Sequence, residues 1–267
     1  MRVKRAGKRR AQGWQAVWVA AAFAFGCAIP VVGLRPYWDV HAAAPERDET
    51  YVKVVSSGGI AMNVIRSTPD RIELKKIATN VTETGMNGIN GGFFYNGDLI
   101  SIAVRGDQPL KGAPGDYGSG WYNVDTKKGT LVWDEAARKL SVQSVLSADE
   151  IVVASRSRYW AQGGVSMTLQ DDGQWERIAL EELMPAFDQK RLRSAVAYDR
   201  DQNLWLIVSD TPCTVPEFRA AIKEKVGRGR LVDGIFLDGD GSSQMKYGPV
   251  LVKGDSRPVY QMLAVKE

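Results

Sequence analysis

The chain has 267 residues, of which 44% are apolar and 25% charged, a globular composition with enough residues for one large core. The net charge of +4 arises at the N-terminus, where the first 13 residues hold six of the 35 basic side chains, and the remainder carries 29 basic against 31 acidic ones. No basic stripe with interleaved aromatic residues follows, so no nucleic-acid partner is expected.

Histidine occurs once, at His41. A Ser-His-Asp or Cys-His catalytic unit and a histidine-rich zinc site are therefore excluded. The two cysteines, Cys27 and Cys213, lie on opposite sides of the expected domain boundary, so no intrachain disulfide is expected. Any chemistry of the folded part must use carboxylates, hydroxyls, amides, arginine or lysine.

The N-terminal region has the pattern of a membrane-targeting segment. A basic tail, residues 1–13, precedes 21 uncharged residues, 14–34, which is long enough to cross the hydrocarbon core. The positive residues before this segment predict a cytoplasmic tail and a transmembrane anchor, with the globular part outside the cytoplasm. A cleaved signal peptide is the alternative, because Ala42-Ala43-Ala44 offers small residues for a peptidase, and the protein would then be secreted.

After a linker at residues 35–50, residues 51–267 predict a single domain of the α+β class, with a mixed β-sheet and few helices. No second linker or internal repeat interrupts it. The alternation of apolar and polar residues predicts strands at 51–55, 60–66 and 71–78. Further strands are expected at 100–104, 140–145, 165–169, 195–198, 204–208, 234–237, 250–252 and 259–265.

Two or three helices are expected, and two of them can be placed. Residues 215–226 have apolar side chains at helical spacing, and Thr214 followed by Glu217 three residues later matches a capping box. A second helix is expected over 179–187, disturbed at Pro185. Helix 215–226 reads as a crossover that leads into strand 234–237, and ligand sites are favoured where such strands end.

Strand 234–237 runs directly into a loop, Asp238-Gly239-Asp240-Gly241-Ser242-Ser243. The glycines can adopt positive φ and leave backbone N–H groups uncovered, while carboxylates and hydroxyls crowd the same region. Such a loop can hold a sugar or an anion and act on it as acid or base. The alternative is a tight turn, for which Asp, Gly and Ser are the usual residues.

Three other segments contain residues suited to a site. Asn90-Gly91-Gly92 is followed by two phenylalanines, which would wall a space that the glycine backbone approaches closely. Arg193 stands at the start of an apolar strand and suits phosphate or carboxylate. Asp210 is the carboxylate that closes the segment Leu206-Ile207-Val208-Ser209-Asp210. Taken singly, each has an ordinary explanation: a glycine turn, a solvated arginine and a strand-end carboxylate.

In this order, the Asn-Gly-Gly-Phe-Phe, Arg-Ser-Ala, strand-Asp and Leu-Asp-Gly-x-Gly-Ser-Ser-Gln-Met motifs resemble the phosphodiester glycosidase family, over about residues 51–267. The resemblance implies hydrolysis of a sugar–phosphate glycosidic bond. It departs from the family at Asp240, where a glycine is usual. This extra carboxylate would repel a phosphate, recruit a divalent cation near Asp238, or shift specificity.

The resemblance also implies roles for the matching residues. Asp238 would act as nucleophile or as base for water, with Asp210 as its partner, and Arg193 would clamp the phosphate. No metal ligand or cofactor is assigned with certainty. The residues expected to bind substrate are Asn90, Gly91, Gly92, Gly239, Asp240, Gly241, Ser242 and Ser243.

An anchored hydrolase outside the cytoplasm would meet cell-envelope glycans such as capsular polysaccharide or exopolysaccharide. Two other classes stay open. One is a non-catalytic module that binds an envelope glycan on the same scaffold, and Asp240 favours it because a changed loop is how an enzyme scaffold loses turnover. The other is an assembly factor of an export machine.

Overall fold

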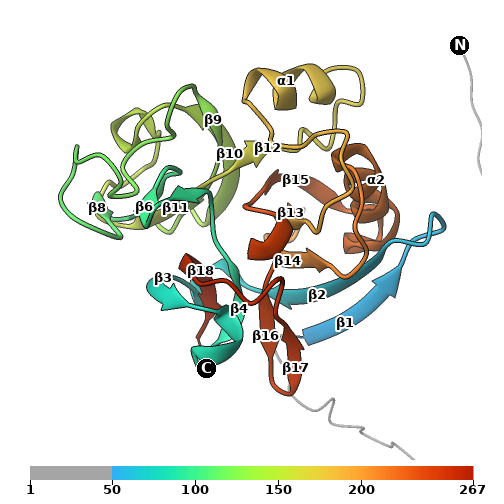
Figure 1. Ribbon diagram of the computed structural model, residues 1–267. Helices are drawn as coiled ribbons and strands as arrows, with labels where there is room; N and C mark the ends of the chain where they lie inside the picture. Colours follow the sequence, from blue (N-terminus) through green and yellow to red (C-terminus); the bar gives the residue numbers. More distant parts are fainter. Residues whose placement is uncertain (1–49, 267) are drawn as a thin grey trace, which may run out of the picture. The chain divides into compact units, whose positions relative to one another are not determined.

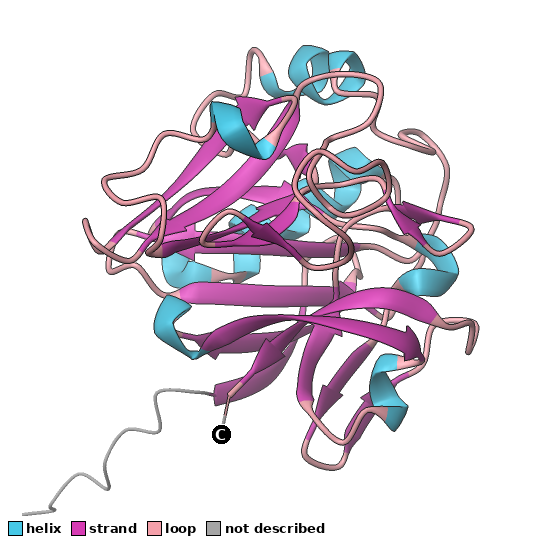
Figure 2. Cartoon of the chain, turned by 90° about the vertical axis from the view of Figure 1, so that its left-hand side faces the viewer, coloured by secondary structure: helices cyan, strands magenta, loops and turns pink. Residues whose placement is uncertain are grey.

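The computed structural model describes residues 50–266. The predicted tail, anchor or signal, and most of the linker lie outside these residues. Within the described part, no helix has the length and apolar character needed to cross a membrane. Strands and loops make up most of it, and the helices are short (Figure 2).

The described chain forms three larger sheets (Figure 1). The six-stranded sheet has the order β1 (Thr50–Val55), β2 (Ala61–Ser67), β14 (Leu204–Ser209), β13 (Ser194–Asp199), β15 (Leu231–Phe236) and β12 (Val165–Ser166). One five-stranded sheet has the order β10 (Lys139–Val145), β9 (Lys128–Asp134), β11 (Tyr159–Gly163), β7 (Ala103–Arg105) and β8 (Gln108–Pro109). The other has the order β17 (Val250–Val252), β16 (Met245–Tyr247), β4 (Asn87–Asn90), β18 (Val259–Val265) and β3 (Ile72–Thr79). A two-stranded hairpin pairs β5 (Phe94–Tyr95) with β6 (Asp98–Leu99).

The prediction of a mixed sheet is wrong for the described residues, because every ladder between their strands is antiparallel. The predicted crossover from β14 through α2 (Val215–Lys225) to β15 is present. It joins two strands of the same direction, but β13 lies between them and pairs with both. A crossover that skips one strand therefore leaves the sheet antiparallel.

The six-stranded sheet is covered on both faces. One face packs against α2 and α1 (Trp175–Glu181) through residues such as Ile207, Phe236 and Phe218. The other packs against both five-stranded sheets through Leu206, Ile235 and their neighbours. Burial on both faces explains why β13 and β14 read as nearly continuous apolar runs rather than as alternating patterns.

The two helices begin and end for local reasons. Helix α2 has the predicted capping box, in which Thr214 accepts from the Glu217 backbone N–H and the Glu217 side chain accepts from that of Thr214. Helix α1 shares only its last three residues with the predicted helix 179–187. It ends early because the chain turns at Leu183, whose φ is 61°.

Candidate functional site

Asp238 follows directly after β15, and backbone hydrogen bonds fix its loop to two other segments. The Asp238 N–H donates to the carbonyl of Gly91 at 3.3 Å, and the Asp240 N–H donates to that of Leu192 at 2.7 Å. The chain then turns through the short helix η5 (Asp240–Ser242). The acidic loop is thus held between the end of β4 and the segment that leads into β13.

Asn90, at the end of β4, is the polar centre beneath this loop. It is 1% exposed, and its Nδ2 donates to the backbone carbonyl of Asp238 at 2.8 Å. Its Oδ1 accepts from the Ser194 hydroxyl at 2.8 Å and from the Gln244 N–H at 3.1 Å. These contacts leave its amide turned toward protein groups, so Asn90 positions the Asp238 peptide.

The glycines of both motifs lie in close contact with other parts of the chain. A Cβ on Gly92 would lie 2.8 Å from the Gly163 carbonyl oxygen, and one on Gly91 would overlap the Gln261 side chain. In the acidic loop, a Cβ on Gly239 would lie 3.0 Å from the Leu192 oxygen, and one on Gly241 would collide with Asp255. The backbone at these glycines therefore approaches other parts of the protein.

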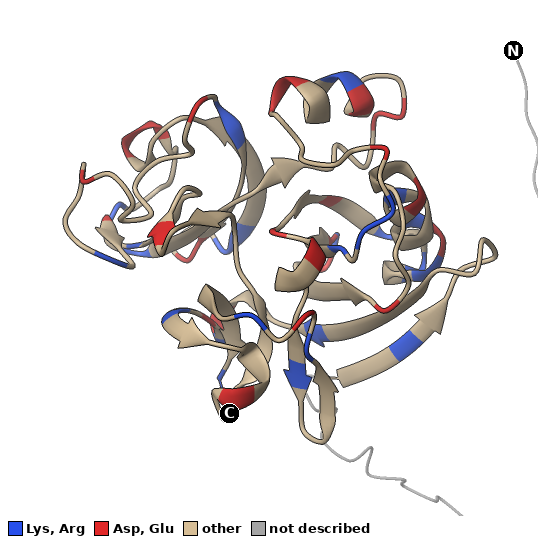
Figure 3. Ribbon diagram, in the orientation of Figure 1, with Lys and Arg blue, Asp and Glu red and all other residues tan. Residues whose placement is uncertain are grey.

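The left-handed residue of the loop is Asp240, with φ of 54°, whereas Gly239 has φ of −112°. A position with this φ favours glycine, and aspartate is among the side chains that tolerate it. The Asp240 carboxylate is 59% exposed and lies 3.8 Å from the Arg191 guanidinium. In Figure 3, η5 is an acidic segment beside the basic loop that leads into β13.

Asp238 is the acid of the site whose pKa is shifted from its usual value. Burial raises its pKa to about 6, and this outweighs hydrogen bonds to its carboxylate from the Ser242 side chain and the Gly239 N–H. Arg257 lies close enough to lower the pKa in part, and Asp240 raises it. The carboxyl therefore changes protonation near neutral pH, as acid and base groups of active sites do.

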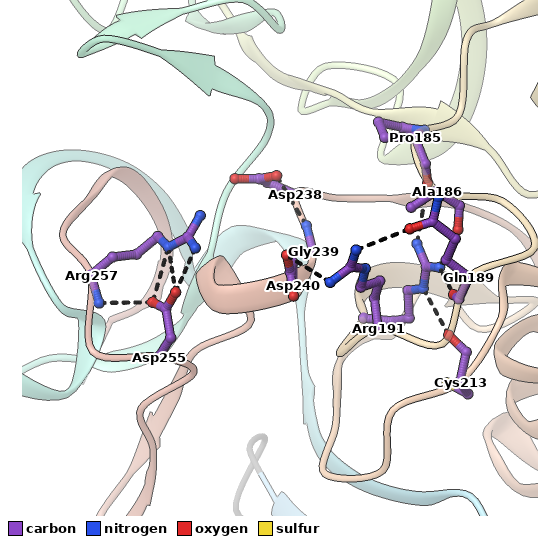
Figure 4. Close-up of polar contacts among 11 residues, drawn as sticks. Pro185, Ala186, Gln189, Arg191, Cys213, Asp238, Gly239, Asp240, Asp255 and Arg257 are labelled. Atoms are coloured by element: carbon purple, nitrogen blue, oxygen red, sulfur yellow. Dashed lines mark hydrogen bonds and ion pairs between the residues drawn. The ribbon is translucent and has the colours of Figure 1, made fainter.

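Asp238 lines a pocket of about 180 Å³. Its other walls come from Phe93, from the segment after α1, from the segment before β13, and from the acidic loop itself. Figure 4 shows Asp238 and Asp240 between Arg257 on one side and Arg191 on the other. Arg257 is held by a two-pronged contact with Asp255. The pocket thus combines a carboxyl of raised pKa, an aromatic wall and the arginines Arg191 and Arg193, while Arg257 lies beside Asp238 outside the lining residues.

Arg193 lines the same pocket but is 3% exposed. Its Nε donates to the carbonyl of Cys213 at 3.1 Å, and its terminal nitrogens donate to those of Pro185, Ala186 and Gln189. Four of the five donors of a guanidinium are thereby used on backbone. Arg193 fixes the pocket wall, and the exposed arginine beside it is Arg191.

Asp210 lies elsewhere. Its carboxylate accepts from Asn63 Nδ2 at 2.6 Å and forms an ion pair with Lys53, so it faces the β1–β2 edge of the six-stranded sheet. It is not among the residues that line the Asp238 pocket. Asp210 follows β14, and β13 lies between β14 and β15, the strand that leads to Asp238. The structure brings Asp238, Asp240, Gly239 and Arg193 to one pocket, and Asp210 to another place.

The two serines of the loop differ. Ser242 is buried and hydrogen-bonds the Asp238 carboxylate. Ser243 is also buried, and its hydroxyl has no hydrogen-bond partner in the described part of the chain. Among residues 50–266, no cluster of three or more His, Cys, Asp or Glu side chains is placed to hold a metal ion. A cation beside Asp238 and Asp240 stays a prediction and would need further oxygen ligands.

Arg191 and Arg257 lie at the site but outside the residues that the sequence motifs predict. Arg191 had a detectable pattern, because residues i and i+2 of an extended segment share a face, and Arg191 stands two residues before Arg193. Its backbone pairs with Cys213 in the structure, as the extended segment requires. Arg257 lies in the loop between β17 and β18, beyond the recognised motifs, and no local pattern marks it.

Comparison with known proteins gives a family and a fold. The family model for phosphodiester glycosidase matches residues 87–266. A search of curated proteins finds no significant match. Among solved structures, the catalytic domain of zebrafish N-acetylglucosamine-1-phosphodiester alpha-N-acetylglucosaminidase, auto-inhibited by its pro-peptide, has a TM-score of 0.54 at 15% identity, covering 82% of each chain.

Two further structures are less similar. A hypothetical protein from Synechocystis has a TM-score of 0.48 at 16% identity, covering 82% of this chain and 62% of its own. A putative exported protein from Burkholderia pseudomallei has a TM-score of 0.45 at 14% identity, covering 78% of this chain and 74% of its own. At such identities, the zebrafish structure supports the fold.

Proposed function

Because the chain belongs to the phosphodiester glycosidase family, we propose that it hydrolyses the bond between a sugar and a phosphodiester in a glycan or glycoconjugate, with Asp238 as the reacting carboxylate. The observation that carries this proposal is the setting of Asp238. It lines a pocket, burial raises its pKa to about 6, and arginines lie on both sides. Glycoside hydrolysis needs such a carboxylate beside the anomeric carbon.

One carboxylate is sufficient for this reaction. Phosphate leaves readily without a proton, so the demand on a general acid is weak, and Asp238 acts as nucleophile or as base for water. The position of Asp210 away from the pocket agrees with a single reacting carboxylate. In this scheme the ionised form of Asp238 is the active one.

The negative charge of the departing phosphate is received by arginine. Arg191 is exposed at the pocket wall, and Arg257 lies on the opposite side of Asp238. A guanidinium offers paired N–H donors that suit phosphate oxygens. Arg193 and Asn90 do not contact the substrate in this scheme. Both donate hydrogen bonds to backbone carbonyls and thereby hold the chain that forms the pocket.

The alternative is a glycan-binding module without turnover, and one observation favours it. The Asp240 carboxylate lies 3.8 Å from Arg191, where it competes with a phosphate for the guanidinium. The contact is exposed on both sides, so water and salt weaken it. We favour hydrolysis because a weak, displaceable pair leaves Arg191 able to turn to substrate.

The location outside the cytoplasm, membrane-anchored or secreted, belongs to the proposal and rests on the uncharged segment 14–34. There the substrates would be phosphodiester-linked sugars of the cell envelope.

The test is sugar release by the purified full-length protein from a panel of hexose and N-acetylhexosamine phosphodiesters, with and without divalent cations. Asp238→Asn should lose at least a hundredfold in rate, while Asp210→Asn, outside the pocket, should stay within about threefold of the parent. If Asp238→Asn released sugar at the parent rate, hydrolysis by this carboxylate would be refuted. A folded parent that binds the panel without releasing sugar would establish the binding module.

A further inference from the structure

A second pocket adjoins the one at Asp238. It measures about 170 Å³ and shares Phe93 and Pro185 with the Asp238 pocket. Each pocket alone is smaller than the roughly 300 Å³ at which ligand pockets usually begin, whereas the two together exceed it. A ligand that reaches across Phe93 and Pro185 would therefore fill both.

The second pocket is apolar with one buried cation. Ile100, Val124 and Leu183 supply apolar walls, and Lys128 is 8% exposed among them. The Lys128 ammonium donates to the Val124 carbonyl at 2.6 Å, which is the one hydrogen bond from its Nζ in the described part of the chain. An ammonium has three donors, and leaving a buried charged group partly unpaired is costly.

The charge of Lys128 is not neutralised by a direct ion pair in the described part of the chain, so an anion could pair with it. Asp125 is exposed at the pocket, and its charge attracts that of Lys128, as does the charge of Glu182. Neither carboxylate forms an ion pair with Lys128 among residues 50–266. The Glu182 carboxylate is already used by the backbone N–H groups of Gly129 and Ser166. Burial lowers the pKa of Lys128, and an anionic ligand would reverse that effect.

The wall between the pockets is conformationally strained. Leu183 has φ of 61° and lines the second pocket, while Ala186 has φ of 49° and lines the first. Side chains with a Cβ rarely adopt this conformation, and such residues cluster at ligand sites. Arg193 holds the segment through the carbonyls of Pro185 and Ala186.

We propose that the pocket at Lys128 is a second subsite, which binds an oxyanion, carboxylate or phosphate, carried by the unit next to the sugar at Asp238. This inference rests on the proposed function, since it extends the same substrate by one unit. It names the substrate class as an anionic glycan. Phe93 would lie between the two units, with Lys128 donating to the anion.

The experiment measures binding and requires no turnover. The full-length protein is titrated by ligand-observed NMR with glucuronic acid, glucose 6-phosphate and methyl glucoside. Both anionic probes should bind, and the neutral one should bind at least tenfold more weakly. The two anionic arms then distinguish a carboxylate from a phosphate as the preferred oxyanion.

Variants locate the binding. Lys128→Met should lose tenfold or more in affinity for the anionic probes, and Asp125→Asn should gain severalfold because it removes the competing charge. Asparagine tolerates the φ of 74° at position 125, so this exposed variant keeps the test decisive if Lys128→Met fails to fold. Lys127→Met is the matched control, because Lys127 pairs with Glu150 and does not line this pocket.

Equal binding of neutral and anionic probes, no binding of any probe, or unchanged affinity in both Lys128→Met and Asp125→Asn would overturn the subsite. Sugar release in the Asp238 assay together with such a result would refute the subsite alone. Lys128-dependent anion binding by a protein that releases no sugar would refute hydrolysis and keep the subsite.

Discussion

Asn90 donates a hydrogen bond of 2.8 Å to the backbone carbonyl of Asp238 and thereby joins two motifs 148 residues apart in the sequence. The same side chain accepts from Ser194 and from the Gln244 N–H, so three segments meet on one buried amide. The geometry of the Asp238 loop therefore depends on a residue that does not line the pocket.

Replacing Asn90 should destabilise the backbone that holds the Asp238 loop. Asn90→Ala leaves the Asp238 carbonyl, the Ser194 hydroxyl and the Gln244 N–H without this partner, and each buried polar group left unpaired costs about 1–3 kcal/mol. We expect a fall of several kcal/mol in the free energy of unfolding, measured by urea denaturation. Ser194→Ala removes only one of these bonds and should cost less. Equal costs would contradict a central role for Asn90.

The two arginines of the pocket should respond differently to substitution. Arg193→Ala removes donors to four backbone carbonyls and should lower the unfolding free energy by about 3 kcal/mol or more. Arg191→Ala, at an exposed side chain, should unfold like the parent but raise KM for a phosphodiester by about tenfold. Thermal unfolding and steady-state kinetics on both variants measure this. A destabilised Arg191→Ala beside a stable Arg193→Ala would reverse our assignment.

The sequence pattern predicted most strands of the six-stranded sheet and the capped helix α2. It missed β9, although that strand is buried along most of its length, because its apolar run, Leu131–Trp133, is only three residues long and is too short to show a period. It also placed all strands in one mixed sheet. Which strands pair is decided by long-range packing, and the skipped strand β13 is not visible in local patterns.

The candidate site, too, was predictable only where its residues are close together in the sequence. Asp238, Gly239 and Asp240 are consecutive, so a motif finds them together, and Arg193 lies at their pocket. Asp210 also ends a strand of the same sheet, yet its side chain turns to Lys53 and Asn63. The direction in which a strand-end side chain turns depends on its partners across the sheet, and these come from β1 and β2, far away in the sequence.

The raised pKa of Asp238 predicts how the rate depends on pH. If the ionised carboxylate reacts, kcat/KM should fall about tenfold per pH unit below the pKa of about 6 and reach a plateau above it. The profile of initial rates between pH 4.5 and pH 8 measures this. Asp240→Asn should shift the midpoint downward, because Asp240 raises the pKa of Asp238. Highest activity at pH 4.5 would show that the protonated form is the active one.

The same pKa makes a prediction for stability. An acid whose pKa is higher in the folded than in the unfolded state binds more protons when folded, so stability is lost as pH rises from about 4 to about 6. Asp238→Asn removes the charged form that burial disfavours. We expect this variant to be more stable than the parent at pH 8 and closer to it at pH 4.5, measured by thermal unfolding. A variant destabilised equally at both pH values would contradict the burial cost assigned to Asp238.

Asp240 allows the strongest test of how this chain departs from its family. Its φ of 54° suits glycine, so Asp240→Gly should fold without strain while removing the carboxylate that lies 3.8 Å from Arg191. Exposed charge pairs contribute about 0.2–1 kcal/mol, so KM for a phosphodiester should fall by a factor of about 1.4 to 5. Asp240→Asn is the control, because asparagine also tolerates this φ. It removes the charge without the added backbone freedom of glycine. The opposite outcome is that divalent cations stimulate the parent and that both variants lose this stimulation. Asp240 would then recruit a cation, and its carboxylate would be part of the reaction.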